Sequence, residues 1–223
     1  MAEMTTLTAD DGHQLGAYRA TPPGPPRGSL VVIQEIFGAN GHIRRTCDGW
    51  AADGYVALAP ALFDRVERNV QLGYAQTDIE QGREMRGKIS TDDAVRDVAA
   101  AVRELAMAGH PVGVVGYCWG GTLAGLSATR IDGVKAAVSY YGGGIAEAAA
   151  EKPRCPVMLH YGETDASIPK EHYEKMRPLL PAESVFVYPA GHGFNCDERG
   201  SFHPPSAQLA RERTLAFFRQ HIG

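Results

Sequence analysis

The chain has 223 residues, of which 44% are hydrophobic and 22% are charged. This length fits a single domain over residues 1–223, and the composition excludes a disordered or collagen-like chain. The 22 basic and 26 acidic residues give a net charge of −4 without a cationic run, which argues against nucleic acid or an anionic membrane as a partner. There is no signal-peptide pattern and no apolar run of membrane-spanning length, so we expect a cytoplasmic protein.

Two extended segments near the N-terminus, Thr5–Thr8 and Gln14–Ala20, flank the turn signal Asp10-Asp11-Gly12 and predict an antiparallel hairpin. The proline-rich stretch Thr21–Gly28 follows and is too short to separate two domains. Beyond it, short β-rich runs alternate with segments of helical period. The predicted strands are Leu30–Gln34, Tyr55–Ala59, Val112–Gly116, Val134–Tyr140, Val157–His160 and Ser184–Tyr188.

Apolar residues recur at helical spacing from Ile43 to Ala51, Ala94 to Leu105, Tyr173 to Leu180 and Ala207 to Phe218. Several predicted strands are apolar throughout, as in a parallel sheet that is covered on both faces. We therefore predict an α/β fold: a three-layer α/β/α sandwich with a mostly parallel sheet and an N-terminal antiparallel edge. In such folds ligands bind at the carboxyl ends of the strands, so the loops there are the places to look for chemistry.

The four cysteines, Cys47, Cys118, Cys155 and Cys196, form no Cys-x-x-Cys pair and no zinc-type spacing with histidine. We expect free thiols, no metal site and no cofactor. Cys118 differs from the others because it lies in Gly116-Tyr117-Cys118-Trp119-Gly120, between a predicted strand and the helical segment Thr122–Thr129. This is the pattern of a nucleophile elbow with cysteine in place of serine. The alternative is a buried structural cysteine in a glycine-rich turn.

A nucleophile on this fold is followed along the chain by an acid and then by a histidine. Asp165 follows the strand Val157–His160, with Glu163 as the competing carboxylate, and His192 lies between two glycines after the last strand. For His160 we expect a packed core position. The remaining histidines, for which we expect solvated or capping roles, are His13, His42, His110, His172, His203 and His221.

These three residues predict hydrolysis of a carboxylic ester or lactone. His192 would support the Cys118 thiolate and later activate water, while Asp165 would fix the tautomer of His192. The intermediate would be an acyl thioester on Cys118. Backbone N–H groups of Trp119 and Ile36 would form the oxyanion hole. Glu35 lies beside this hole, where a carboxylate opposes the developing negative charge unless it has another task.

Three segments, Gln34-Glu35-Ile36-Phe37-Gly38, the cysteine elbow and Ala190-Gly191-His192-x-Phe194, together resemble the dienelactone hydrolase (carboxymethylenebutenolidase) family, which has the α/β-hydrolase fold. The resemblance implies that Cys118 is the nucleophile, His192 the base and Asp165 its orienting acid. It also implies that Glu35 contacts the resting thiol and activates it, and that the substrate is a small enol-lactone.

The sequence departs from the family where an arginine that binds the substrate carboxylate is expected four residues after His192. Cys196 occupies that position and Arg199 lies nearby, and both are candidate substrate-binding residues. A second arginine of this kind would be Arg83 or Arg86. If Cys196 replaces that arginine, we expect Glu35 to lose its cation and the enzyme to favour neutral or singly charged small esters and lactones. The alternative for Glu35 is a structural carboxylate that binds loop amides or a nearby cation.

Further aromatic candidates for the pocket are Phe37, Tyr74, Trp119 and Tyr141. Two other functions stay open: a promiscuous thiol esterase or lactonase, and a binding or redox-responsive protein that uses Cys118 and Cys196. We expect a monomer or a small homo-oligomer.

Overall fold

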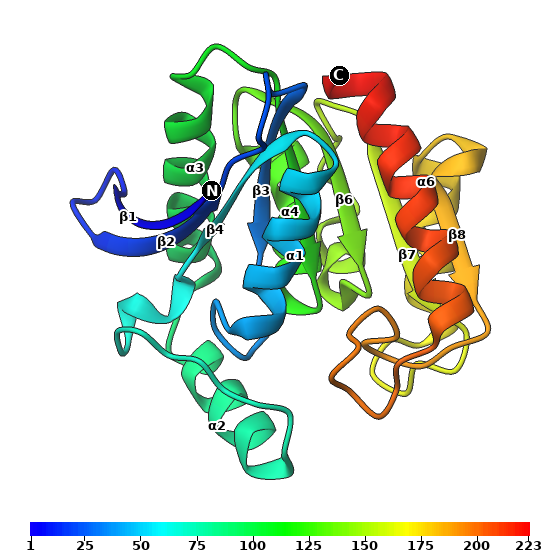
Figure 1. The fold of residues 1–223 in the computed structure, drawn as a ribbon. Coiled ribbons are helices and arrows are strands. Elements are labelled where there is room, and N and C mark those ends of the chain that lie inside the picture. The colour runs from blue at the N-terminus through cyan, green and yellow to red at the C-terminus, as the bar shows by residue number, and fades with distance from the viewer.

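The computed structural model describes residues 1–223, apart from the side chain of Ala182. Its centre is an eight-stranded sheet of order β1-β2-β4-β3-β5-β6-β7-β8 (Figure 1). The strands are β1 (Ala2–Thr8), β2 (Gln14–Ala20), β3 (Gly28–Ile33), β4 (Tyr55–Pro60), β5 (Val112–Tyr117), β6 (Val134–Tyr140), β7 (Val157–Gly162) and β8 (Val185–Tyr188). β2 pairs antiparallel with β1 and β4, whereas β4, β3 and β5 to β8 pair in parallel. The predicted N-terminal antiparallel edge is confirmed.

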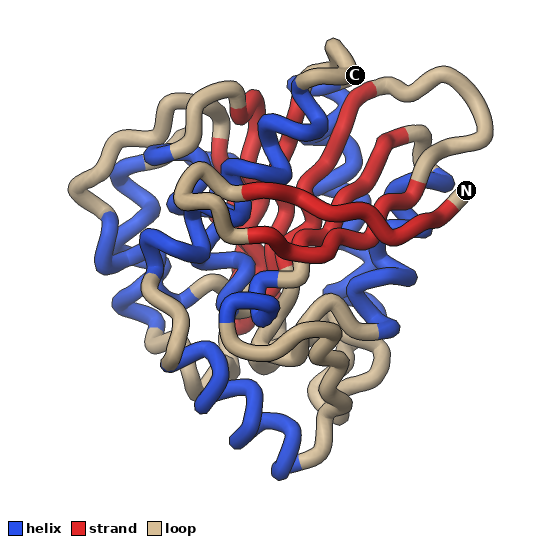
Figure 2. Tube along the Cα trace, turned by 90° about the vertical axis from the view of Figure 1, so that its left-hand side faces the viewer, coloured by secondary structure: helices blue, strands red, loops and turns tan.

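Helices cover both faces of this sheet (Figure 2). α1 (Gly41–Ala52) and α6 (Pro204–Ile222) pack on one face, and α3 (Thr91–Ala106) and α4 (Trp119–Arg130) on the other. Because both faces are covered, β3, β4, β5 and β7 are buried along their whole length. The three-layer prediction is confirmed. Among the described residues, no helix combines the length and the apolar character that crossing a membrane requires.

Helix α2 (Gln76–Gly87) is an element that the hydrophobic pattern did not predict. Only Gly82 and Met85 of this helix are buried, so it has no apolar stripe. It projects from the body of the protein beyond the carboxyl ends of the parallel strands (Figure 1). A Cβ at Gly82 would lie 2.0 Å from the carbonyl oxygen of Ile36, so the glycine lets α2 pack directly on the loop after β3.

The predicted helical segment from Tyr173 to Leu180 is shorter in the structure. α5 spans Lys170–Met176, and a 3₁₀ turn, Arg177–Leu179, follows it. Pro178 explains the early end, because proline lacks the N–H that a continuing α-helix needs. Leu180 therefore lies outside the helix.

Candidate active site

The turn between β5 and α4 places Cys118 at φ 56° and ψ −117°, an uncommon backbone conformation for a residue with a side chain. A Cβ at Gly116 would lie 1.9 Å from the carbonyl oxygen of Gly120, and a Cβ at Gly120 would lie 2.4 Å from that of Gln34. Both flanking glycines are therefore required for this packing. The turn puts the thiol at the N-terminus of α4, where the helix dipole favours a thiolate.

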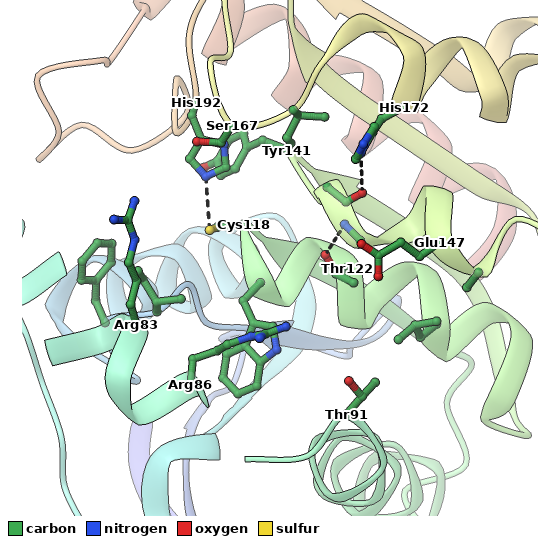
Figure 3. Close-up of a pocket in the computed structure, with 18 of the residues that line it drawn as sticks. Arg83, Arg86, Thr91, Cys118, Thr122, Tyr141, Glu147, Ser167, His172 and His192 are labelled. Atoms are coloured by element: carbon green, nitrogen blue, oxygen red, sulfur yellow. Dashed lines mark hydrogen bonds between the residues drawn. The ribbon is translucent and has the colours of Figure 1, made fainter. Parts of the chain in front are cut away.

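A chain of hydrogen bonds joins Cys118 to residues of two other loops. His192, in the loop after β8, approaches Cys118 Sγ with its Nε2 at 3.2 Å, as Figure 3 shows. Its Nδ1 lies 2.7 Å from Oδ2 of Asp165, in the loop after β7. The Asp165 side chain is fully buried and also accepts the Ser167 N–H at 2.8 Å. The competing carboxylate, Glu163, is exposed.

This arrangement determines the charge of His192. Burial opposes the imidazolium form, but the hydrogen bonds to Asp165 and Cys118 outweigh it and raise the pKa of His192 to about 10. An imidazolium next to the sulfur is the environment that activates cysteine nucleophiles. The geometry therefore places a protonated imidazole beside the Cys118 sulfur.

A cavity of about 700 Å³ opens above the Cys118 thiol. The predicted substrate-contacting residues that line it are Phe37, Arg83, Arg86, Trp119, Tyr141 and Arg199. Figure 3 shows Arg83 and Arg86 projecting from α2 on one side, with His172 and Glu147 on the other. Neither α2 arginine forms an ion pair with any described residue, so both are available to an anionic ligand.

The two predicted oxyanion-hole residues, Ile36 and Trp119, also line the cavity. Ile36 lies in the loop after β3, and Trp119 is the first residue of α4. The first N–H groups of a helix have no partner within it, which leaves the Trp119 N–H available to a ligand. Their joint role in binding an oxyanion stays a prediction.

Glu35 lies behind the cavity wall with 1% of its surface exposed. Its Oε1 accepts a hydrogen bond from Arg199 Nη1 at 2.9 Å, and its Oε2 accepts one from the Tyr74 hydroxyl at 3.4 Å. Burial opposes the charge of Arg199, but Glu35 outweighs it and raises the pKa of Arg199. The expectation that Glu35 loses its cation is wrong, because Arg199 supplies one from three residues farther along the chain. The thiol-activating role of Glu35 stays a prediction.

Cys196 is fully buried and does not line the cavity. This corrects the expectation that it contacts substrate. Burial, together with the nearby Glu35 carboxylate, raises the pKa of the Cys196 thiol to about 11. Tyr74, expected to line the cavity, lies instead between Phe37, whose ring centroid is 4.5 Å away, and Glu35.

Two other histidines differ in how well the sequence predicted them. His160 is fully buried and lies within 3.0 Å of the hydroxyl groups of Tyr188 and Thr214, so its predicted core position is confirmed. Burial lowers its pKa to about 3. His42 was expected to be solvated or capping but is only 6% exposed, and its Nδ1 lies 3.1 Å from Asp197 Oδ1. The helical pattern of α1 did not reveal this contact, because Asp197 belongs to a distant loop.

The mixed sheet with helices on both faces and the elbow after β5 define an α/β-hydrolase. Within that class, the chain belongs to the dienelactone hydrolase family, whose sequence model matches residues 15–222. The resemblance inferred from the three sequence segments is thereby confirmed.

Solved and curated relatives agree with this assignment. A crystal structure described as a "Putative Dienelactone Hydrolase" from Klebsiella pneumoniae has a TM-score of 0.87 and 33% identity, with 99% of each chain covered. Two relatives are named "Putative carboxymethylenebutenolidase". The one from Yersinia pestis is 34% identical over 97% of this chain and 87% of its own, and the one from Azospirillum brasilense is 35% identical over the whole of both. The chain is accordingly a carboxylic ester hydrolase of the carboxymethylenebutenolidase-like kind.

Proposed function

We propose that this hydrolase opens a small enol-lactone with an anionic group, using Cys118 as the nucleophile and an acyl thioester as the intermediate. The observation that supports this most directly is the hydrogen-bonded chain from Asp165 through His192 to the Cys118 sulfur, which opens on a 700 Å³ cavity. A cysteine needs such a partner, because the thiolate and not the thiol is the nucleophile.

In the first half of the reaction, the Cys118 thiolate attacks the lactone carbonyl carbon, and the carbonyl oxygen becomes an oxyanion bound by the N–H groups of Ile36 and Trp119. The carbon–oxygen bond of the ring then breaks. The leaving oxygen takes the proton from His192 Nε2, and the acyl group remains on the sulfur as a thioester.

In the second half, His192 is neutral and accepts a proton from water as the water oxygen attacks the thioester carbonyl. The carbon–sulfur bond breaks, the sulfur leaves as the thiolate, and the carboxylic acid product is released. Asp165 holds Nδ1 protonated throughout, so Nε2 always faces the reacting atoms. One water is consumed for each bond hydrolysed.

Positive charge around the cavity supports an anionic substrate. Arg199 lies on the cavity wall, and Arg83 and Arg86 extend toward it from α2. A charge-assisted hydrogen bond from arginine to a carboxylate contributes about 1.5–3 kcal/mol, which corresponds to tenfold or more in substrate preference. In place of the expected preference for neutral or singly charged esters and lactones, we therefore propose a preference for the carboxylated lactone over its neutral ester.

A broader thiol esterase is the second candidate function. The cavity, at about 700 Å³, is larger than a small lactone needs, and it could admit other acyl groups. The redox alternative lacks such support, because all four cysteines are free and Cys196 is fully buried.

The test compares kcat/KM for a carboxymethylene-butenolide and its methyl ester, in the wild type and in Arg199→Gln, Arg83→Gln and Arg86→Gln. We expect the wild type to favour the acid about tenfold or more, and at least one variant to lose that preference. Arg177→Gln, an exposed arginine outside the cavity, is the matched control. Acid-quenched samples analysed by mass spectrometry should show the acyl group on Cys118. An acyl group on another residue would overturn the mechanism, and equal rates for acid and ester would overturn the substrate class.

A further inference from the structure

A second group of reactive side chains lies behind the cavity wall and does not include Cys118, His192 or Asp165. It consists of Glu35 from the loop after β3, His42 from the first turn of α1 and Cys196 from the loop after β8. One ligand atom of each lies within 4.8 Å of the other two, and all three residues are buried. A thiol, an imidazole and a carboxylate are the ligands that zinc sites use.

The orientation of His42 points to a ligand. Its Nδ1 is 3.1 Å from the Asp197 carboxylate, and its Nε2 is buried without a hydrogen-bond partner in the described part of the chain. A buried polar atom without a partner destabilises a fold unless something binds it. Histidines that bind metals commonly donate their other ring N–H to a carboxylate, which leaves the free nitrogen as the ligand. Asp197 and His42 have this relationship.

We propose that Glu35, His42 and Cys196 form a binding site for a divalent cation of the Zn²⁺ type, distinct from the group of Cys118, His192 and Asp165. Bonds of about 2.0–2.3 Å in a tetrahedral site put ligand atoms about 3.5 Å apart, so the three side chains need to close up only slightly. The Cys196 S–H bond breaks as the metal–sulfur bond forms, and the proton passes to the buffer. The Cys196 thiolate and the Glu35 carboxylate, which Arg199 also contacts, then offset most of the positive charge at the site.

Glu35 connects this site to the cavity. One of its oxygens accepts the hydrogen bond from Arg199, and a carboxylate can keep that bond while its second oxygen binds a metal. The Tyr74 hydroxyl, 3.4 Å from Glu35 Oε2, is the group that would have to yield. Metal binding therefore acts on the residue that positions Arg199 at the cavity wall.

The test uses Co²⁺, whose bond to a thiolate gives a near-ultraviolet absorption band, in a Cys118→Ser background. This background removes Cys118, the other thiol with a histidine partner. The absorption measurement does not depend on enzyme activity. We expect one Co²⁺ per chain with the thiolate band, displaced by Zn²⁺. Adding Cys196→Ser should abolish the band, and adding His42→Gln should weaken Co²⁺ binding by about tenfold or more. Cys155→Ser, which changes a half-buried thiol outside the group, should leave both unchanged.

The outcomes separate the possible sites. A band that is present in the wild type but absent in Cys118→Ser would place the metal at Cys118 and His192 and overturn the proposal. A band that survives Cys196→Ser, or binding that His42→Gln does not weaken, would overturn it as well, as would no binding to the folded protein. Circular dichroism tests whether each variant is folded. If Cys196→Ser fails to fold, the result for His42→Gln decides.

Discussion

Two sets of cysteine, histidine and aspartate occur in this protein, and their surroundings differ. In the first set, the Asp165 side chain is fully buried. His192 contacts Asp165 through Nδ1 and approaches Cys118 through Nε2. Cys118 lies on the cavity at the N-terminus of α4. Here the aspartate is protected from water and the thiol is open to a substrate.

In the second set, the exposure is reversed. Asp197 has 59% of its side chain exposed and contacts His42 through Nδ1, while the His42 ring and Cys196 are buried. The Glu35 carboxylate lies beside Cys196, and together with burial it raises the pKa of the thiol. The Cys196 sulfur is buried and does not line the cavity, and a thiolate there would need a bound cation to offset its charge.

The same residue types therefore serve different chemistry because of burial and neighbouring charge. A thiol beside an imidazolium and a helix N-terminus is a nucleophile. A buried thiol beside a carboxylate and an unpartnered imidazole nitrogen is a ligand that needs a metal ion to ionise. This contrast gives the following experiments.

Replacing the first thiol should have the largest effect. We expect Cys118→Ala to lower kcat/KM for an aryl ester or lactone by about 10⁴-fold or more, because the covalent intermediate cannot form. Cys47→Ala, at a buried position in α1 away from the cavity, should retain hydrolysis. Steady-state kinetics on both variants check this. A Cys118→Ala enzyme within tenfold of the wild type would remove the distinction between the two sets.

We expect the second-largest loss of activity when the buried aspartate, Asp165, is replaced. Asp165→Asn should lower kcat about 10²–10⁴-fold, because it removes the charge that holds the His192 tautomer. Glu163→Gln, the exposed neighbour, should stay within about threefold of the wild type.

The pH dependence gives a second measure of the same substitution. The pKa of His192 is raised to about 10, so the interaction of its imidazolium with Asp165 stabilises the fold fully below the ordinary histidine pKa. This stabilisation is lost as pH rises through the raised pKa. In Asp165→Asn that loss should occur at lower pH. Titration of the His192 imidazole by NMR measures the shift, and an unchanged pKa would show that Asp165 does not stabilise the charge.

Alkylation separates a reactive thiol from an ordinary one. Cys118 and Cys155 are both half-buried, but burial raises the pKa of Cys155 to about 11, and no cation opposes it. We expect one equivalent of iodoacetamide at pH 7 to label Cys118 about 100-fold faster than Cys155, with Cys196 slower still. Peptide mapping over time gives the order. Labelling of Cys155 first would contradict a protonated imidazole beside Cys118.

Most of the fold could be predicted because its signals are local. The strands β2 and β6 matched their predicted bounds, and the others differed by a few residues, because apolar or alternating runs mark strands locally. Helix α2 was not predicted, because only two of its residues, Gly82 and Met85, are buried. Its position depends on contact with the loop after β3, which leaves no periodic pattern in the sequence.

The site divides in the same way. Cys118, Asp165 and His192 could be selected because each lies at a strand end with glycine or turn residues beside it. The pairing of Glu35 with Arg199 and that of His42 with Asp197 could not, because each joins segments more than 150 residues apart, and side-chain reach decides them. The sequence offered Arg199 as a nearby replacement for the missing arginine, but its spacing alone could not show the contact with Glu35.

The smallest effect is expected for the exposed aspartate of the second set. Asp197→Asn should lower the free energy of unfolding in the absence of metal by less than about 1 kcal/mol, because the Asp197 side chain is exposed and the amide oxygen of asparagine can still accept the hydrogen bond from His42 Nδ1. Asp97→Asn is the positive control, since that carboxylate is fully buried and contacts Arg65 through two hydrogen bonds of 2.7 Å, so disrupting this pair should cost about 3–5 kcal/mol. Urea unfolding followed by circular dichroism compares the two. A loss above about 2 kcal/mol for Asp197→Asn would mean that its bond to His42 already holds the loop after β8 against α1, and the second set would then be structural without any metal.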